Sequence, residues 1–140
     1  MVGNVASYVG QEQGDYCDDD LEVQVAGRTV VVEPDRMVVR GGHVLVQRIR
    51  TGRQTASEDE KPVYTLLKMG ARVRFPEASV AVEAYYPNDG EAVPINGQNE
   101  AKALRTYSDA IAGIEAGAFS ARPADPRYCP NCQCYFICGA

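Results

Sequence analysis

The sequence feature that most constrains the fold is a run of cysteines near the end of the chain. Cys129, Cys132 and Cys138 follow the spacing C-x2-C-x5-C, and Cys134 lies between the last two. Zinc ions and iron–sulfur clusters are both held by closely spaced thiolates. A disulfide knot would leave one of the five cysteines unpaired, and the first ten residues lack the basic and apolar regions of a secretion signal. The pattern therefore favours a metal centre over disulfides, and disulfides over free thiols.

The composition predicts an acidic protein with one main domain. The chain has 140 residues and a net charge of −5, and no apolar run approaches a membrane span, so we expect a cytoplasmic protein. We divide it into an irregular segment, residues 1–20, and an α/β domain, residues 21–140. Between residues 28 and 53 six arginines stand against two acids, a local charge of +4. Such a stretch can face phosphate, although a solvated sheet edge fits the composition better.

The first half of the chain predicts strands. β-forming runs separated by turns at residues 26–27 and 41–42 indicate a β-meander over residues 21–51. Because side chains alternate between the faces of a strand, Arg48 and Arg50 share a face after the second turn. Two arginines in line on a strand need water or acidic partners.

The second half of the chain alternates helices and strands. The pattern S-x-x-E over residues 57–60 fits a capping box in front of the first helix. In chain order we expect a helix from Pro62 to before Pro76, strands over residues 79–85 and 91–95, and a helix from caps at residues 96–99 to Gly117. The apolar stripe of the second helix comprises Leu104, Tyr107, Ile111 and Ile114. The order of elements predicts a mixed α/β fold.

These segments resemble the RecB-like branch of the PD-(D/E)XK nucleases, a domain that also closes many UvrD/Rep-type helicases. Its members carry an Asp at the end of a hairpin, an acid-x-Lys-Thr-Gly strand, a Gln-x-x-x-Tyr helix and a C-x2-C-x5-C tail. The matching segments here are residues 34–38, 46–53, 60–64 and 114–138. The resemblance implies a restriction-endonuclease-like mixed sheet flanked by helices, with a cysteine-rich, metal-binding tail.

The resemblance also implies that the catalytic centre is lost. In active relatives the hairpin Asp and the strand acid hold a divalent metal, and the Lys positions the attacking water. Here Asp35 remains, but Arg48 takes the acid position and Arg50 the lysine position; Glu60 replaces the Gln, and Tyr64 is kept. Guanidinium groups repel cations, so we expect neither Mg²⁺ nor nuclease activity. We predict that Arg48 instead pairs with Asp35, with room for two parallel hydrogen bonds.

For the tail, the resemblance implies a 4Fe-4S cluster on Cys129, Cys132 and Cys138, with zinc as the alternative metal. Relatives often carry a first cluster cysteine upstream of the hairpin, where this chain offers Cys17. Cys134 is the alternative fourth ligand. Relatives also place a first helix there, so the short segment before the hairpin suggests a truncated module or a fragment of a larger helicase.

Three functions stay open at this point. The first is a catalytically degenerate nuclease domain with an iron–sulfur staple, which binds or guides DNA within a helicase–nuclease repair or recombination machine. Its expected DNA contacts are Arg48, Arg50 and Arg53. The second is an active metal-dependent nuclease with a rearranged site that combines Asp35 with Glu60 or Glu83. The third is a zinc-ribbon-like interaction module.

Overall fold

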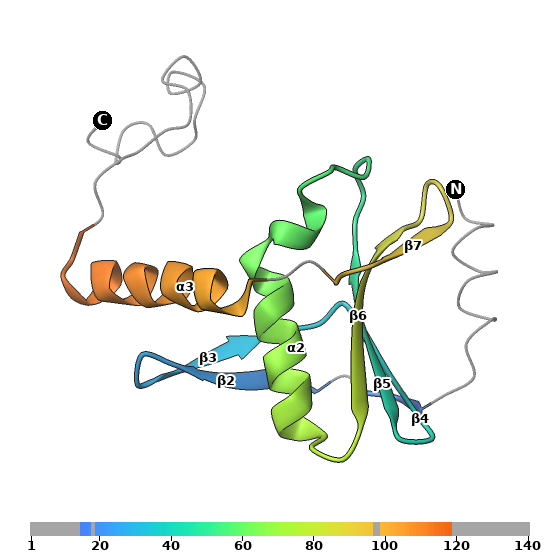
Figure 1. Ribbon diagram of the computed structural model, residues 1–140, viewed down its shortest axis with the longest axis horizontal. Coiled ribbons are helices and arrows are strands. Elements are labelled where there is room, and N and C mark those ends of the chain that lie inside the picture. Colours follow the sequence, from blue (N-terminus) through green and yellow to red (C-terminus); the bar gives the residue numbers. More distant parts are fainter. Residues whose placement is uncertain (1–14, 18, 97–98, 119–140) are drawn as a thin grey trace. The chain divides into compact units, whose positions relative to one another are not determined.

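The structure is a computed structural model that describes residues 15–17, 19–96 and 99–118. It shows a mixed α/β protein (Figure 1). The chain divides into two compact units inside its last helix, the first ending at Tyr107 and the second beginning at Ser108. The elements are β1 (Asp15–Tyr16), β2 (Leu21–Val25), β3 (Arg28–Val32), β4 (Arg36–Arg40), β5 (His43–Ile49), the 3₁₀ turn η1 (Glu58–Glu60), α2 (Pro62–Arg74), β6 (Ser79–Tyr86), β7 (Glu91–Pro94) and α3 (Glu100–Glu115).

The larger sheet has five strands in the order β1-β4-β5-β6-β7. All neighbours in it run antiparallel except β5 and β6, which are parallel. A parallel pair needs a crossover connection, and residues 50–78, which contain the 13-residue helix α2, supply it. The mixed sheet confirms the predicted α/β class.

The first two strands of the predicted meander form a sheet of their own. β2 pairs with β3 around a turn at Ala26 and Gly27, whose φ angles are 50° and 74°, and this sheet has no further strand among the described residues. One continuous meander over residues 21–51 is therefore wrong, although both turns lie where they were predicted. Pro34 follows β3 and has no backbone N–H, so it cannot extend the ladder toward β4.

The helix α2 lies between the hairpin and the larger sheet (Figure 1). It begins at Pro62 and ends at Arg74, as predicted, but Ser57 makes no side-chain cap and the predicted capping box is absent. Leu66 and Leu67 are buried, and Gly70 lies so close to β2 that an added Cβ would come within 2.7 Å of the Leu21 Cβ. The missing side chain of Gly70 thus sets the spacing between α2 and the hairpin.

The helix α3 has the predicted ends. The Asn99 side chain caps it by accepting a hydrogen bond from the Lys102 backbone N–H at 3.0 Å, and Gly117 follows with a φ of 65°. In its predicted apolar stripe, Leu104, Tyr107 and Ile111 are half-buried and Ile114 is 63% exposed. The buried residue of α3 is Ala103. None of the described helices has the length and apolar character needed to cross a bilayer.

Candidate functional site

The β4–β5 hairpin brings Asp35 and Arg48 together. Arg36 pairs with Gln47 in the antiparallel register, so the next residues outward, Asp35 and Arg48, lie opposite each other. The Arg48 Nε lies 3.5 Å from the Asp35 Oδ2, and the same oxygen accepts a hydrogen bond from the backbone N–H of Ile49 at 2.8 Å. The predicted ion pair is present, but it is a single long Nε contact without the two parallel hydrogen bonds.

Arg50, the residue that follows β5, contacts a different acid. Its Nε lies 3.1 Å from Oε1 of Glu58, a residue of η1 whose side chain is only 4% exposed. Glu58 also accepts hydrogen bonds from the Tyr64 hydroxyl at 2.5 Å and from the Lys61 amino group. We call these four residues the Glu58 cluster. Sequence analysis missed Glu58 and selected Glu60, which is exposed.

The cluster sets the protonation of its members. Burial alone raises the pKa of the Glu58 carboxyl, but hydrogen bonds from Lys61 and Tyr64 and the charge of Arg50 outweigh it, so this pKa lies below its ordinary value of 4.5. Glu58 is therefore ionised at neutral pH. Burial, reinforced by the Glu58 carboxylate, raises the pKa of Tyr64, which keeps its hydroxyl protonated as a donor.

A second tyrosine, Tyr86, lies beside Glu58 and Arg50. The Tyr86 side chain is 1% exposed, and its hydroxyl has no hydrogen-bond partner within the described part of the chain. Burial and then the Glu58 carboxylate raise the pKa of Tyr86, while Arg50 lowers it, so the hydroxyl lies in the field of both groups. The Tyr86 hydroxyl is therefore a buried neighbour of the Arg50–Glu58 ion pair.

The opposite face of the sheet carries a row of polar side chains. Arg36 donates to the Tyr16 hydroxyl at 2.7 Å and to the Gln47 side chain at 3.2 Å, and Gln47 donates to Glu83. The row crosses β1, β4, β5 and β6. Because Gln47 and Arg48 are neighbours in β5, their side chains point to opposite faces. Glu83 is thus directed away from the ion pair.

The acids of the rearranged nuclease site are not brought together. Asp35 pairs with Arg48, Glu83 lies on the other face, and Glu60 is exposed on η1. Across residues 15–17, 19–96 and 99–118, no three Asp, Glu, His or Cys side chains gather as metal ligands. A divalent cation at Asp35 would meet the Arg48 guanidinium beside it, so the residues present do not fit Mg²⁺.

The predicted ligands of the tail, Cys129, Cys132, Cys134 and Cys138, lie outside the described residues. Cys17 is described and is a half-buried free thiol. Its Sγ donates to Asp19 at 3.3 Å, and Asp19 also accepts from Arg74 at 3.0 Å. The hydrogen bond from Cys17, followed by the contact with Arg74, lowers the pKa of the Asp19 carboxyl. The role of Cys17 as the fourth ligand stays a prediction, because its proposed partners lie outside the described residues.

Arg53, the third expected DNA contact, is exposed in the loop after β5 and has no ion pair with any described residue.

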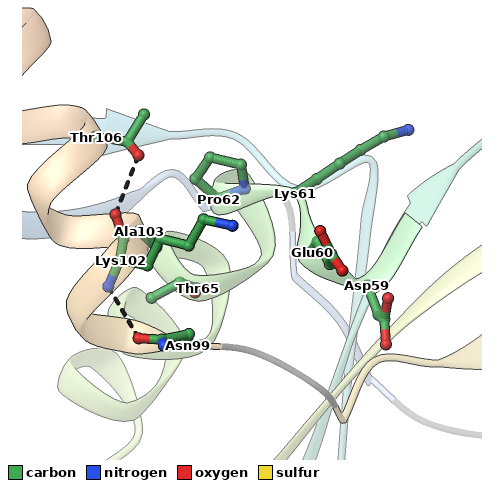
Figure 2. Close-up of a pocket in the computed structure, with 9 residues that line it drawn as sticks. All are labelled: Asp59, Glu60, Lys61, Pro62, Thr65, Asn99, Lys102, Ala103 and Thr106. Carbon is green, nitrogen blue, oxygen red and sulfur yellow. Dashed lines mark hydrogen bonds between the residues drawn. The ribbon is translucent and has the colours of Figure 1, made fainter. Parts of the chain in front are cut away.

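A cavity of about 230 Å³ lies beside η1, at the starts of α2 and α3 (Figure 2). The residues that line it carry both signs of charge, Asp59 and Glu60 on one side of the balance and Lys61 and Lys102 on the other. This mixture favours no simple anion or cation in the cavity.

No protein-family model matches the chain, and no curated protein matches its sequence. Among solved structures the chain is similar to one described as the crystal structure of SSO0001, with a TM-score of 0.49 and 19% identity. The similarity covers 99% of this chain and 66% of that one, so this chain spans less than two thirds of its length. A similarity at this level defines neither the family nor the function of the chain.

Proposed function

We propose that the chain is a catalytically degenerate nuclease domain of the RecB-like PD-(D/E)XK class, which binds DNA within a helicase–nuclease repair or recombination machine. The observation that carries this proposal is the contact of 3.5 Å between Arg48 and Asp35. In the family that the sequence resembles, a second acid stands at the Arg48 position and shares a metal ion with the hairpin Asp. Here the guanidinium takes the place of the metal's positive charge.

The lysine position supports the same conclusion. Arg50 stands there and is held by Glu58, so both acids near the end of β5 are already neutralised by cations. A nuclease of this class needs a divalent metal to form the attacking hydroxide and to stabilise the leaving oxygen. We therefore expect the domain to bind DNA without cleaving it.

The DNA contacts of the proposed function come from the end of β5 and the following loop. Arg48 and Arg50 keep about a third of their side chains exposed, at 30% and 35%, and Arg53 is exposed as well. Exposed arginines bind phosphates and release counterions from DNA, so affinity falls steeply as salt rises. Contacts of this kind carry no sequence preference.

The proposal includes a metal staple in the tail. Cys129, Cys132 and Cys138 are the proposed ligands of a 4Fe-4S cluster, with Cys17 as the fourth ligand and Cys134 as its alternative. Such a centre would tie the end of the chain to the domain and take no part in cleavage. Zinc is the alternative metal, and the iron content and visible absorption of the purified protein distinguish the two.

Binding of fluorescein-labelled single- and double-stranded DNA, followed by anisotropy over a salt series, tests the function. Joint replacement of Arg50 and Arg53 by Ala should weaken binding and flatten the salt slope by about two charges. Arg105→Ala is the matched control, since Arg105 is an exposed arginine on α3. Unchanged affinity in the double variant would refute the DNA contacts, and cleavage with Mg²⁺ or Mn²⁺ would refute the degenerate centre.

A further inference from the structure

The Glu58 cluster separates its charges by depth. The Glu58 carboxylate is inside, with a side chain 4% exposed, whereas the side chains of Arg50 and Lys61 are each 35% exposed. The carboxylate thus cannot reach a ligand in solution, but both of its cations can. A buried acid that holds two surface cations in fixed positions makes both cations available to a ligand in solution.

Both cations keep donors that Glu58 does not use. A guanidinium has five N–H donors, and the contact of Arg50 with Glu58 is made through Nε, so the donors of its two terminal nitrogens lie outside that contact. The Lys61 amino group has three N–H donors, and its contact with Glu58 takes one of them. An arginine fork matches two oxygens of a phosphate, and an ammonium adds a point charge.

The start of α2 also favours an anion at this place. Lys61 is the N-cap of α2, no side chain caps this 13-residue helix, and its N-terminal end carries partial positive charge. The helix end therefore adds positive potential beside the two cations. The Tyr86 hydroxyl is as buried as the Glu58 carboxylate and stays out of reach of a ligand in solution.

We propose that Arg50 and Lys61 form a phosphate-binding site and that Glu58 is its positioning residue. The site deepens the proposed function, because the phosphate source there is DNA, but the chemistry applies equally to a free phosphate ion. Asp59 and Glu60 stand next to Lys61 in the sequence, and in Figure 2 the Lys61 amino group extends away from their carboxylates. Arg50 and Lys61 stand against Glu58, Asp59 and Glu60, a net charge of −1, so fixed geometry and not net charge must account for the affinity of the site.

The positioning role of Glu58 predicts whether Glu58→Gln raises or lowers the affinity for DNA. Glu58→Gln removes a negative charge, and charge alone would therefore tighten the binding of DNA. If Glu58 positions the two cations, the same variant must bind DNA more weakly, by about tenfold, because a charge-assisted contact that fixes Arg50 is lost. Glu77→Gln is the matched control: it removes the same charge from an exposed glutamate in the turn after α2 and should leave binding unchanged or slightly tighter.

Labelled DNA followed by anisotropy gives the affinities, and circular dichroism shows that each variant is folded. Should Glu58→Gln fail to fold, Arg50→Lys and Lys61→Ala replace it. Arg50→Lys keeps the charge but loses the fork, and both variants should weaken DNA binding. The melting temperature in inorganic phosphate against chloride at equal ionic strength tests the free ion, which should stabilise the wild type more than Lys61→Ala.

The outcomes separate this site from the proposed function. Tighter DNA binding by Glu58→Gln, or unchanged binding by Arg50→Lys and Lys61→Ala, overturns the site while DNA binding through other residues stands. Stabilisation by inorganic phosphate that depends on Lys61, without any DNA binding, supports the site and overturns the DNA function. Absence of both DNA binding and phosphate stabilisation overturns the two together.

Discussion

Gly70 gives the sharpest test of how α2 packs against the β2–β3 hairpin. A Cβ at this position would lie 2.7 Å from the Leu21 Cβ and 3.3 Å from the Val23 Cγ2. The Leu21 Cβ is attached to the backbone and cannot rotate away, so β2 or α2 must move. Overpacking of this kind costs about 1–3 kcal/mol. In a helix, however, alanine is favoured over glycine by about 1 kcal/mol, which acts in the opposite direction.

A second helical glycine allows the overpacking cost to be separated from the gain in helix propensity. Gly113 lies inside α3, and an added Cβ there meets nothing within 4 Å. Because the gain in helix propensity is common to Gly70→Ala and Gly113→Ala, it cancels in their difference, which leaves the overpacking cost of about 1–3 kcal/mol. Urea unfolding with equal m-values would measure it. If both substitutions stabilise the protein equally, the close approach of α2 to the hairpin is wrong.

Further predictions concern the site and the tail. Glu58 has a lowered folded-state pKa, so its contribution to stability is present above its ordinary value of 4.5 and is lost as the pH falls through the lowered one. Urea melts on the acid side should show this loss in the wild type and not in Glu58→Gln; equal pH profiles would contradict it. The Asp35–Arg48 pair is partly exposed, so a double-mutant cycle should give a coupling of only about 0–1 kcal/mol, and a larger value would mean a tighter pair. Arg48→Asp combined with Arg50→Lys restores the family pattern and should create Mg²⁺ binding measurable by calorimetry; no binding would count against a former metal centre. Cys132→Ser should lose bound metal and, because structural metals contribute on the order of 10 kcal/mol, most of its stability. An unchanged melting temperature and metal content would rule out the staple.

Local patterns in the sequence predicted much of the fold. The turns at residues 26–27 and 41–42, the start of α2 at Pro62 and the Asn99 cap all follow from the chemistry of a few neighbouring residues. Which strands pair is decided over longer distances, and this is where the prediction failed. Pro34 interrupts the chain between Val32 and Arg36, but an interruption alone does not show that β3 stays with β2 while β4 joins another sheet.

The candidate site was likewise predicted where its contacts are fixed by neighbouring residues, and it was missed where they depend on other elements. Asp35 and Arg48 meet because a tight hairpin fixes their register, and hairpin register can be read from a turn. Glu58 and Glu60 stand two residues apart in one acidic run, and composition does not distinguish them. The 3₁₀ turn buries the first and exposes the second, and that choice depends on Arg50 and Tyr64 arriving from other elements.

The parallel pairing of β5 with β6 has a consequence for how the protein folds. β4 and β5 are joined by a tight turn and can pair within microseconds, so the Asp35–Arg48 contact forms early. The pairing of His43 with Ser79 must instead close a long loop around α2, which is slower. Val82 pairs with Val46 only when that loop has closed, so its contacts form late. Stopped-flow chevrons of Val82→Ala should therefore show faster unfolding with little change in the folding rate.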